Sequence, residues 1–183
     1  MRIDFGKQSY LYPMPVLIIA TYDDQGKPNA MNAAWGGIHD TNQIGICCDG
    51  SHKTADNLRL NKAFTVSIGD AQHVDACDYV GMVSGKKVSD KFEKAGFTAT
   101  KSAFVNAPII NELPMCLECE LVSYDEESGA LVGNILNISA DESIVTMGKI
   151  DPSKFKPITY DPVNHKYIAL GKVVGDAFSK KEM

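Results

Sequence analysis

The stretch NAMNAAWGG, residues 29–37, sets small and polar side chains around the only tryptophan of the chain, Trp35. It follows a β-branched apolar run, PVLIIAT (15–21), and a segment rich in Asp, Gly, Pro and Asn, DDQGKPN (23–29). The run predicts a buried strand and the polar segment predicts a turn. NAMNAAWGG is then expected to be the extended return strand of a hairpin.

Further strands are expected on both sides of a helical middle. Short strands are predicted at QIGICCD (43–49) and AFTVSIGD (63–70). A longer β region follows, in which DEESG between two alternating runs indicates a hairpin. Its strands are MCLECELVSY (115–124), ALVGNILNISA (130–140) and KYIALGKVVGDAF (166–178).

Helices are expected only in short pieces. SHKTADNLRLNK (51–62) has rough helical spacing of apolar residues, and Ser51 can cap it. Residues 74–96 suggest short helices broken by glycines. Strands with short links favour a mainly β single domain, 1–183, with an antiparallel barrel and peripheral helices. No GxGxxG follows a strand and no GxxxxGK[ST] occurs, so the common nucleotide folds have no support.

Composition excludes several classes of function. The net charge of −5 and the lack of a basic stripe argue against nucleic acid. The longest apolar run, PVLIIA, is too short to cross a bilayer and has no charged leader, so no membrane association is expected and the chain is predicted to be cytoplasmic. Cys116 and Cys119 form a CxxC within a strand, where they would point to opposite faces, so no metal site is expected. The odd count of five cysteines favours reduced thiols.

Two segments together suggest a cofactor. In CCDGSHKTADN (47–57) a strand ends and a helix begins, and the free N–H groups there, with the hydroxyls and the lysine of SHKT, would suit an anion. In NAMNAAWGG, small side chains leave room for a flat ligand, and Asn29 and Asn32 offer amides to its polar edge. Trp35 would either wall such a site or pack in the core. A flat heterocycle with a phosphate describes FMN.

An ordered series of segments carries a family resemblance: PMPVLIIAT (13–21), DDQGKPNAMNAAWGG (23–37), SHKTADN (51–57), AFTVSIGD (63–70), DYVGMVSGKKVSDKFEKAGF (78–97) and APIINELPMCLECEL (107–121). With it the chain resembles the flavin reductase-like FMN-binding split barrels, and within them the flavoredoxin branch. The resemblance implies a six-stranded antiparallel split barrel with Greek-key features, a homodimer, and FMN near the dimer interface.

The resemblance also implies cofactor-binding positions. The residues implied to line the isoalloxazine are Asn29, Ala30, Met31, Asn32, Ala33 and Trp35. The neighbouring strand would end beside the ring with Cys47, Cys48 and Asp49. The phosphate would be held by Ser51, His52, Lys53 and Thr54. Lys91 and Phe92 match family positions that lie near the cofactor. Tyr160 or Tyr167 could supply an aromatic cap. Because flavin carries the redox chemistry itself, no acid–base pair is required, and no catalytic side chain is assigned.

The expected function is an oxidoreductase that passes electrons from NADH or NADPH through FMN to flavin, ferric iron or a protein acceptor. Two alternatives stay open: a flavoredoxin-type carrier without nicotinamide turnover, and a non-enzymatic barrel that binds FMN or haem. Related two-component reductases often carry Gly-Asp-His for nicotinamide use. Here Gly175-Asp176-Ala177 lacks the histidine, which favours the carrier.

Overall fold

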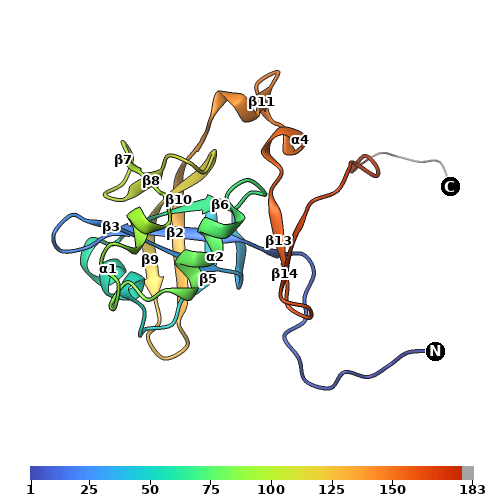
Figure 1. The fold of residues 1–183 in the computed structure, drawn as a ribbon, viewed down its shortest axis with the longest axis horizontal. Helices are drawn as coiled ribbons and strands as arrows, with labels where there is room; N and C mark the ends of the chain where they lie inside the picture. The colour runs from blue at the N-terminus through green and yellow to red at the C-terminus, as the bar shows by residue number, and fades with distance from the viewer. Residues whose placement is uncertain (179–183) are drawn as a thin grey trace.

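The main sheet of the molecule has seven antiparallel strands in the order β3-β2-β6-β9-β10-β5-β4 (Figure 1). The structure, a computed structural model, describes residues 1–178, so the last five residues of the expected domain 1–183 lie outside it. The strands are β2 (Leu17–Tyr22), β3 (Pro28–Ala33), β4 (Gly36–Asp40), β5 (Gln43–Cys47), β6 (Ala63–Ile68), β9 (Met115–Tyr124) and β10 (Ala130–Ala140).

The order of these strands shows that the sheet is curled. β3 and β4 lie at opposite edges, yet only Ala34 and Trp35 separate them in the chain. A flat seven-stranded sheet would hold its edges about 29 Å apart, since neighbouring strands are about 4.8 Å apart. Two linking residues reach only about 11 Å. The sheet therefore closes on itself, and the expected antiparallel split barrel is confirmed, with one strand more than six.

β2 explains the unbroken apolar run of the sequence, because both of its faces are buried. Leu17 and Ile19 point into the barrel core with Phe64 of β6. Val16 and Ile18 point outward into a second core with Phe92. Burial on both faces removes the alternation that a half-exposed strand would show.

Three helices pack against the β2–β3 part of the barrel: α1 (Lys53–Asn61), α2 (Val74–Met82) and α3 (Lys91–Lys94). α1 corrects the expected 51–62 helix, because His52 rather than Ser51 occupies its N-cap and no side chain caps it. The backbone N–H of Ser51 instead donates to the Asp49 carboxylate at 2.8 Å, which holds Ser51 in the preceding turn.

Smaller elements stand beside the barrel. β1 (Met14–Pro15), β13 (Ile158–Asp161) and β14 (Lys166–Ala169) form a small sheet, and Figure 1 shows the N-terminal segment and the described segment after β14 leaving from this side. The expected strand 166–178 is therefore too long, since β14 ends at Ala169 and residues 170–178 belong to no strand. The remaining elements are the pair β7 (Ala99–Lys101) and β8 (Pro108–Ile110), the pair β11 (Val145–Thr146) and β12 (Lys149–Ile150), the 3-10 turn η1 (Glu142–Ile144) and α4 (Pro152–Phe155).

Candidate functional site

A pocket of about 180 Å³ opens where β3, the start of α1 and the segment after α2 meet. Seven residues that the sequence proposed for FMN line it together: Asn29, Met31, Asn32, His52, Lys53, Thr54 and Lys91. They come from three separate stretches of the chain. The fold thus gathers both halves of the expected cofactor site, the amide-bearing strand and the anion-binding turn.

The β3 and α1 sides of the pocket are fastened to each other by a buried hydrogen bond. The Asn29 side chain donates from Nδ2 to Oγ1 of Thr54 at 3.2 Å, and both residues are buried. Gly85 lies against this pair, and a Cβ added there would overlap Oδ1 of Asn29. A residue without a side chain is therefore required at position 85 to keep the Asn29–Thr54 contact and the pocket.

The start of α1 is suited to an anion. Within residues 1–178, the backbone N–H groups of Lys53 and Thr54 have no hydrogen-bond acceptor, and His52 makes no side-chain cap. Unpaired N–H groups and the helix dipole give this end partial positive charge. The Lys53 ammonium adds a full charge and takes part in no ion pair found in the described chain.

Lys91 is a buried cation at the other side of the pocket. It is 4% exposed and donates from Nζ to the backbone oxygens of Val80 at 3.0 Å and Val83 at 2.8 Å. Burial lowers the pKa of this ammonium to about 8. No carboxylate in residues 1–178 forms an ion pair with it. Its position fixes the end of α2 and leaves a positive charge on the pocket wall at neutral pH.

A second hollow, of about 250 Å³, continues from the first. The two share Asn32, Gly81 and Met82, so they are parts of one groove. The new walls are Tyr160 and Tyr167 of the β13–β14 hairpin, whose ring centroids are 5.9 Å apart, and Asp78. Each hollow is smaller than an ordinary ligand pocket of about 300–1,000 Å³, but the joined groove reaches that range. Both tyrosines considered as an aromatic cap lie here.

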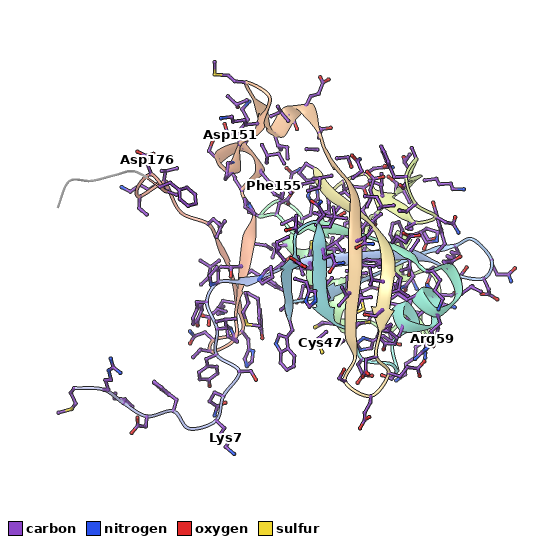
Figure 2. All side chains as sticks on the ribbon, turned by 180° about the vertical axis from the view of Figure 1, so that it is seen from behind. Lys7, Cys47, Arg59, Asp151, Phe155 and Asp176 are labelled. Carbon is purple, nitrogen blue, oxygen red and sulfur yellow. The ribbon has the colours of Figure 1, made fainter. Side chains whose placement is uncertain are left out.

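The other proposed residues lie outside this groove. Four are buried among core side chains: Ala30, Ala33, Cys48 and Phe92. Asp49 and Ser51 are exposed in the turn before α1. Trp35 and Cys47 line a different, shallow groove on the β4–β5 edge, where Figure 2 labels Cys47 at one end of the barrel. Trp35 is 58% exposed, so the packed-core alternative for this residue is wrong.

Several groove residues were not singled out from the sequence. Gly85 and Asp78 belong to the segment that carried the family resemblance, yet only Lys91 and Phe92 were named in it. The pair Gly81 and Gly85 four residues apart was an available signal, because such glycines allow close backbone approach. Nothing local marked Asp78, whose partner Tyr167 is 89 residues away.

Metal and membrane features are absent from the part of the chain described. Residues 1–178 contain no cluster of three or more His, Cys, Asp or Glu able to hold a metal ion. No helix among them has the length and apolar character needed to cross a membrane. All five cysteines are free thiols.

Comparison with known proteins gives a consistent result. Residues 9–162 match the family model described as the flavin reductase like domain. The structure is similar to flavoredoxin of Desulfovibrio vulgaris (Miyazaki F), with a TM-score of 0.93 and 33% identity over 98% of this chain and 99% of that one.

Two further relatives extend the comparison. The flavoredoxin from Methanosarcina acetivorans matches with a TM-score of 0.88 and 27% identity, covering 98% of this chain and 97% of that chain. A Bacillus subtilis (strain 168) protein of uncharacterised function, YdfE, is 27% identical over 91% of this chain and 88% of its own length.

Proposed function

Because the chain belongs to the flavin reductase-like domain family, we propose that it binds FMN in the β3–α1–α2 groove and transfers electrons through it. The observation that carries the proposal is that three kinds of chemical group line one groove. These are the amides of Asn29 and Asn32, the uncapped start of α1, and the buried cation of Lys91. Together these groups match a flat polar ring with an anionic tail.

The residues present fit FMN in two respects. The free N–H groups of Lys53 and Thr54, with the Lys53 ammonium, would bind the phosphate. Gly81 and Gly85 let their segment approach β3 closely, since a Cβ at position 85 would overlap Asn29 and one at position 81 would press on Asn32, so these glycines leave both amides in place on the groove wall. Bound FMN supplies the electron-accepting chemistry. Lys91 would keep a positive charge beside it, which favours an electron-rich ligand.

The electron donor is proposed to be NADH or NADPH, and the acceptor to be flavin, ferric iron or a protein. A flavoredoxin-type carrier without nicotinamide turnover is the second candidate, favoured by the similarity to two flavoredoxins. Asp176, in the tripeptide that departs from Gly-Asp-His, is drawn on the C-terminal segment away from the barrel (Figure 2). That tripeptide gives the nicotinamide reaction no support. With five free thiols, the reducing cytoplasm is the proposed location.

A second copy of the chain is proposed to cover the β4 edge. Trp35 and Ile38 are exposed there, and the N-terminal arm displays Phe5 and Leu11. The arm stands clear of the barrel, as the labelled Lys7 shows in Figure 2. A hollow of about 540 Å³ between Tyr10 of the arm and Trp35 continues this apolar surface. Large apolar side chains exposed next to one another are typical of a protein–protein interface.

The test of the function is the visible spectrum of the purified protein. We expect flavin absorption bands, which bleach on anaerobic addition of NADH or NADPH if the protein is a reductase. Bands that bleach only with dithionite would identify the carrier. A colourless protein that also fails to take up added FMN would refute the proposal, and uptake of haem instead would indicate the non-enzymatic barrel.

The phosphate assignment has its own test. Lys53→Ala is expected to weaken FMN binding about tenfold, the loss of a charged hydrogen bond or ion pair, and to leave riboflavin binding nearly unchanged. Lys149→Ala removes an exposed lysine in β12, away from the groove, and serves as the control. Equal losses for FMN and riboflavin would refute the assignment.

A further inference from the structure

A chain of hydrogen bonds runs from the groove into the β13–β14 hairpin. Asn32 donates from Nδ2 to the backbone oxygen of Cys77 at 3.1 Å and, over a longer 3.4 Å, to the hydroxyl of Tyr167. Tyr167 in turn donates to Oδ1 of Asp78 at 2.8 Å. Asn32 and Tyr167 are 135 residues apart in sequence, so only the folded chain joins them.

The direction of this chain is fixed by chemistry. A backbone carbonyl only accepts hydrogen bonds, so the amide atom facing Cys77 must be the nitrogen of Asn32. A tyrosine hydroxyl has one proton, and here that proton goes to the Asp78 carboxylate, which leaves the oxygen to accept from Asn32. Burial and the contact with Asp78 both raise the pKa of Tyr167, so the hydroxyl keeps its proton across the physiological range.

One consequence concerns the other atom of the amide. With Nδ2 engaged on two acceptors, the carbonyl oxygen Oδ1 of Asn32 is the atom left for a ligand, and no residue within 1–178 donates to it. Asn32 lines both hollows of the groove. The groove therefore presents a hydrogen-bond acceptor at this point of β3, and an acceptor selects a ligand with an N–H group.

We propose that Asp78 and Tyr167 are positioning residues that hold the Asn32 amide with Oδ1 toward the ligand, where it accepts the N3–H of the flavin ring. The inference rests on the proposed function. N3–H is the only ring N–H of an oxidised isoalloxazine, so a fixed acceptor identifies that edge of the ring. Without Tyr167, only the backbone oxygen of Cys77 would hold Nδ2, so the Asn32 amide would be oriented less firmly.

Two variants and two ligands test the proposal. Tyr167→Phe removes the hydroxyl and keeps the ring, and Asp78→Asn replaces the carboxylate with a group that also donates. Tyr124→Phe is the matched control, because it removes a half-buried hydroxyl that donates to the backbone oxygen of Cys48 and lines neither hollow of the groove. The probes are FMN and FMN methylated at N3, and the dissociation constants are measured by calorimetry on the full chain freed of flavin.

The wild-type chain is expected to bind FMN about tenfold more tightly than the methylated probe, the cost of leaving one acceptor unpaired. Tyr167→Phe and Asp78→Asn are expected to weaken FMN binding about fivefold and to reduce the preference to about twofold, because the contact with Cys77 then orients the amide alone. Tyr124→Phe is expected to keep the wild-type preference. Thermal unfolding midpoints matched among the three variants show that folding is unaffected.

Two results would overturn the inference alone. One is a wild-type chain that binds FMN and the methylated probe equally. The other is a full tenfold preference retained in both Tyr167→Phe and Asp78→Asn. If the wild-type chain binds no FMN, the proposed function fails first and the inference falls with it.

A second readout separates positioning from general destabilisation. If the fixed Oδ1 favours one redox state of the flavin, the midpoint potential of bound FMN shifts in Tyr167→Phe and stays at the wild-type value in Tyr124→Phe. Equal potentials in all chains, together with an unchanged preference for FMN, would leave Tyr167 with a purely structural role and refute the proposal.

Discussion

The two halves of NAMNAAWGG have opposite environments. In the first half, Asn29 and Asn32 sit in the groove and are joined through hydrogen bonds to α1, to α2 and to the β13–β14 hairpin. In the second half, Trp35 lies on the sheet edge with exposed apolar surface, and so does Ile38 directly after it. The side chains of the first half are packed and hydrogen-bonded within their own chain, whereas the Trp35 side chain is largely exposed. The contrast indicates that a single copy builds the ligand groove but leaves an apolar edge to be covered.

The largest expected effect is on that edge. Trp35→Ala should raise the dissociation constant of the proposed dimer at least about 30-fold, because a large aromatic at an interface centre contributes about 2 kcal/mol or more. Sedimentation equilibrium measures the constant. Leu60→Ala is the control, since Leu60 is 56% exposed, close to the 58% of Trp35, but lies on α1. A monomeric wild-type chain, or equal constants for the two variants, would remove the proposed role of this half.

The next effect tests the engaged half. Gly85→Ala should weaken FMN binding by about 2 kcal/mol, since the added Cβ would overlap Asn29 and push it from Thr54. Gly37→Ala, in β4, is the matched control, because a Cβ there meets no atom within 4 Å. Titration with FMN gives both affinities. Comparable losses of FMN affinity in the two variants would mean that FMN binding does not depend on the close packing of Gly85 against Asn29.

The sequence was sufficient to predict the barrel class, because strand periodicity and turn residues are local signals. PVLIIAT, DDQGKPN and the DEESG hairpin each lie where these signals place them. It was not sufficient to divide NAMNAAWGG into β3 and β4. The break at Ala34–Trp35 has no Pro, and it depends on the two sheet edges meeting, which is a property of the whole barrel.

The same limit applies to the site. His52, Lys53 and Thr54 could be proposed because a strand, a turn and a helix follow each other there. Their meeting with Lys91 depends on α3 folding back against α2, and no spacing in the sequence states it. The Ser51 cap was wrong because the Asp49 carboxylate holds Ser51 in the preceding turn through its backbone N–H, and the helix begins after His52. Local propensity does not locate such a boundary to one residue.

A smaller effect is expected from the buried cation of the groove. The pKa of Lys91 is about 8 in the folded chain, below its usual 10.5, so the unfolded state binds more protons between these values. The free energy of unfolding of the flavin-free wild type should therefore rise by about 1–3 kcal/mol from pH 8 to pH 10.5, relative to Lys91→Met. Urea unfolding across this range measures it.

The control for this pH dependence is Lys86→Met. Lys86 is exposed and pairs with Asp56 at 2.9 Å, so its removal should leave the wild-type profile between pH 8 and 10.5 unchanged. Parallel profiles for the wild type and Lys91→Met would show that Lys91 titrates normally. The buried positive charge would then not be a feature that distinguishes the groove from the edge.

The smallest effect concerns the attachment of the N-terminal arm to the β13–β14 hairpin. Asp161 accepts hydrogen bonds from the Tyr12 hydroxyl and from Asn164, and the Tyr12 contact is the main reason that its pKa falls to about 2. This contribution is complete above the ordinary carboxyl pKa of about 3.9 and is lost as pH falls from there through about 2. The arm should therefore loosen in acid while the barrel remains folded.

Asp161→Asn reproduces the uncharged state at neutral pH and gives the decisive comparison. Chymotrypsin should cut after Tyr10 about threefold faster than in the wild type, the loss of about one weakened hydrogen bond. Asp141→Asn is the control, because Asp141 caps η1 through Ser143 and does not contact the arm. Equal cutting in all three chains would show that Asp161 does not hold the arm. Faster cutting in Asp161→Asn alone would mean that the hairpin carrying Tyr167 also anchors the arm, so that one hairpin serves both the engaged groove and the exposed edge.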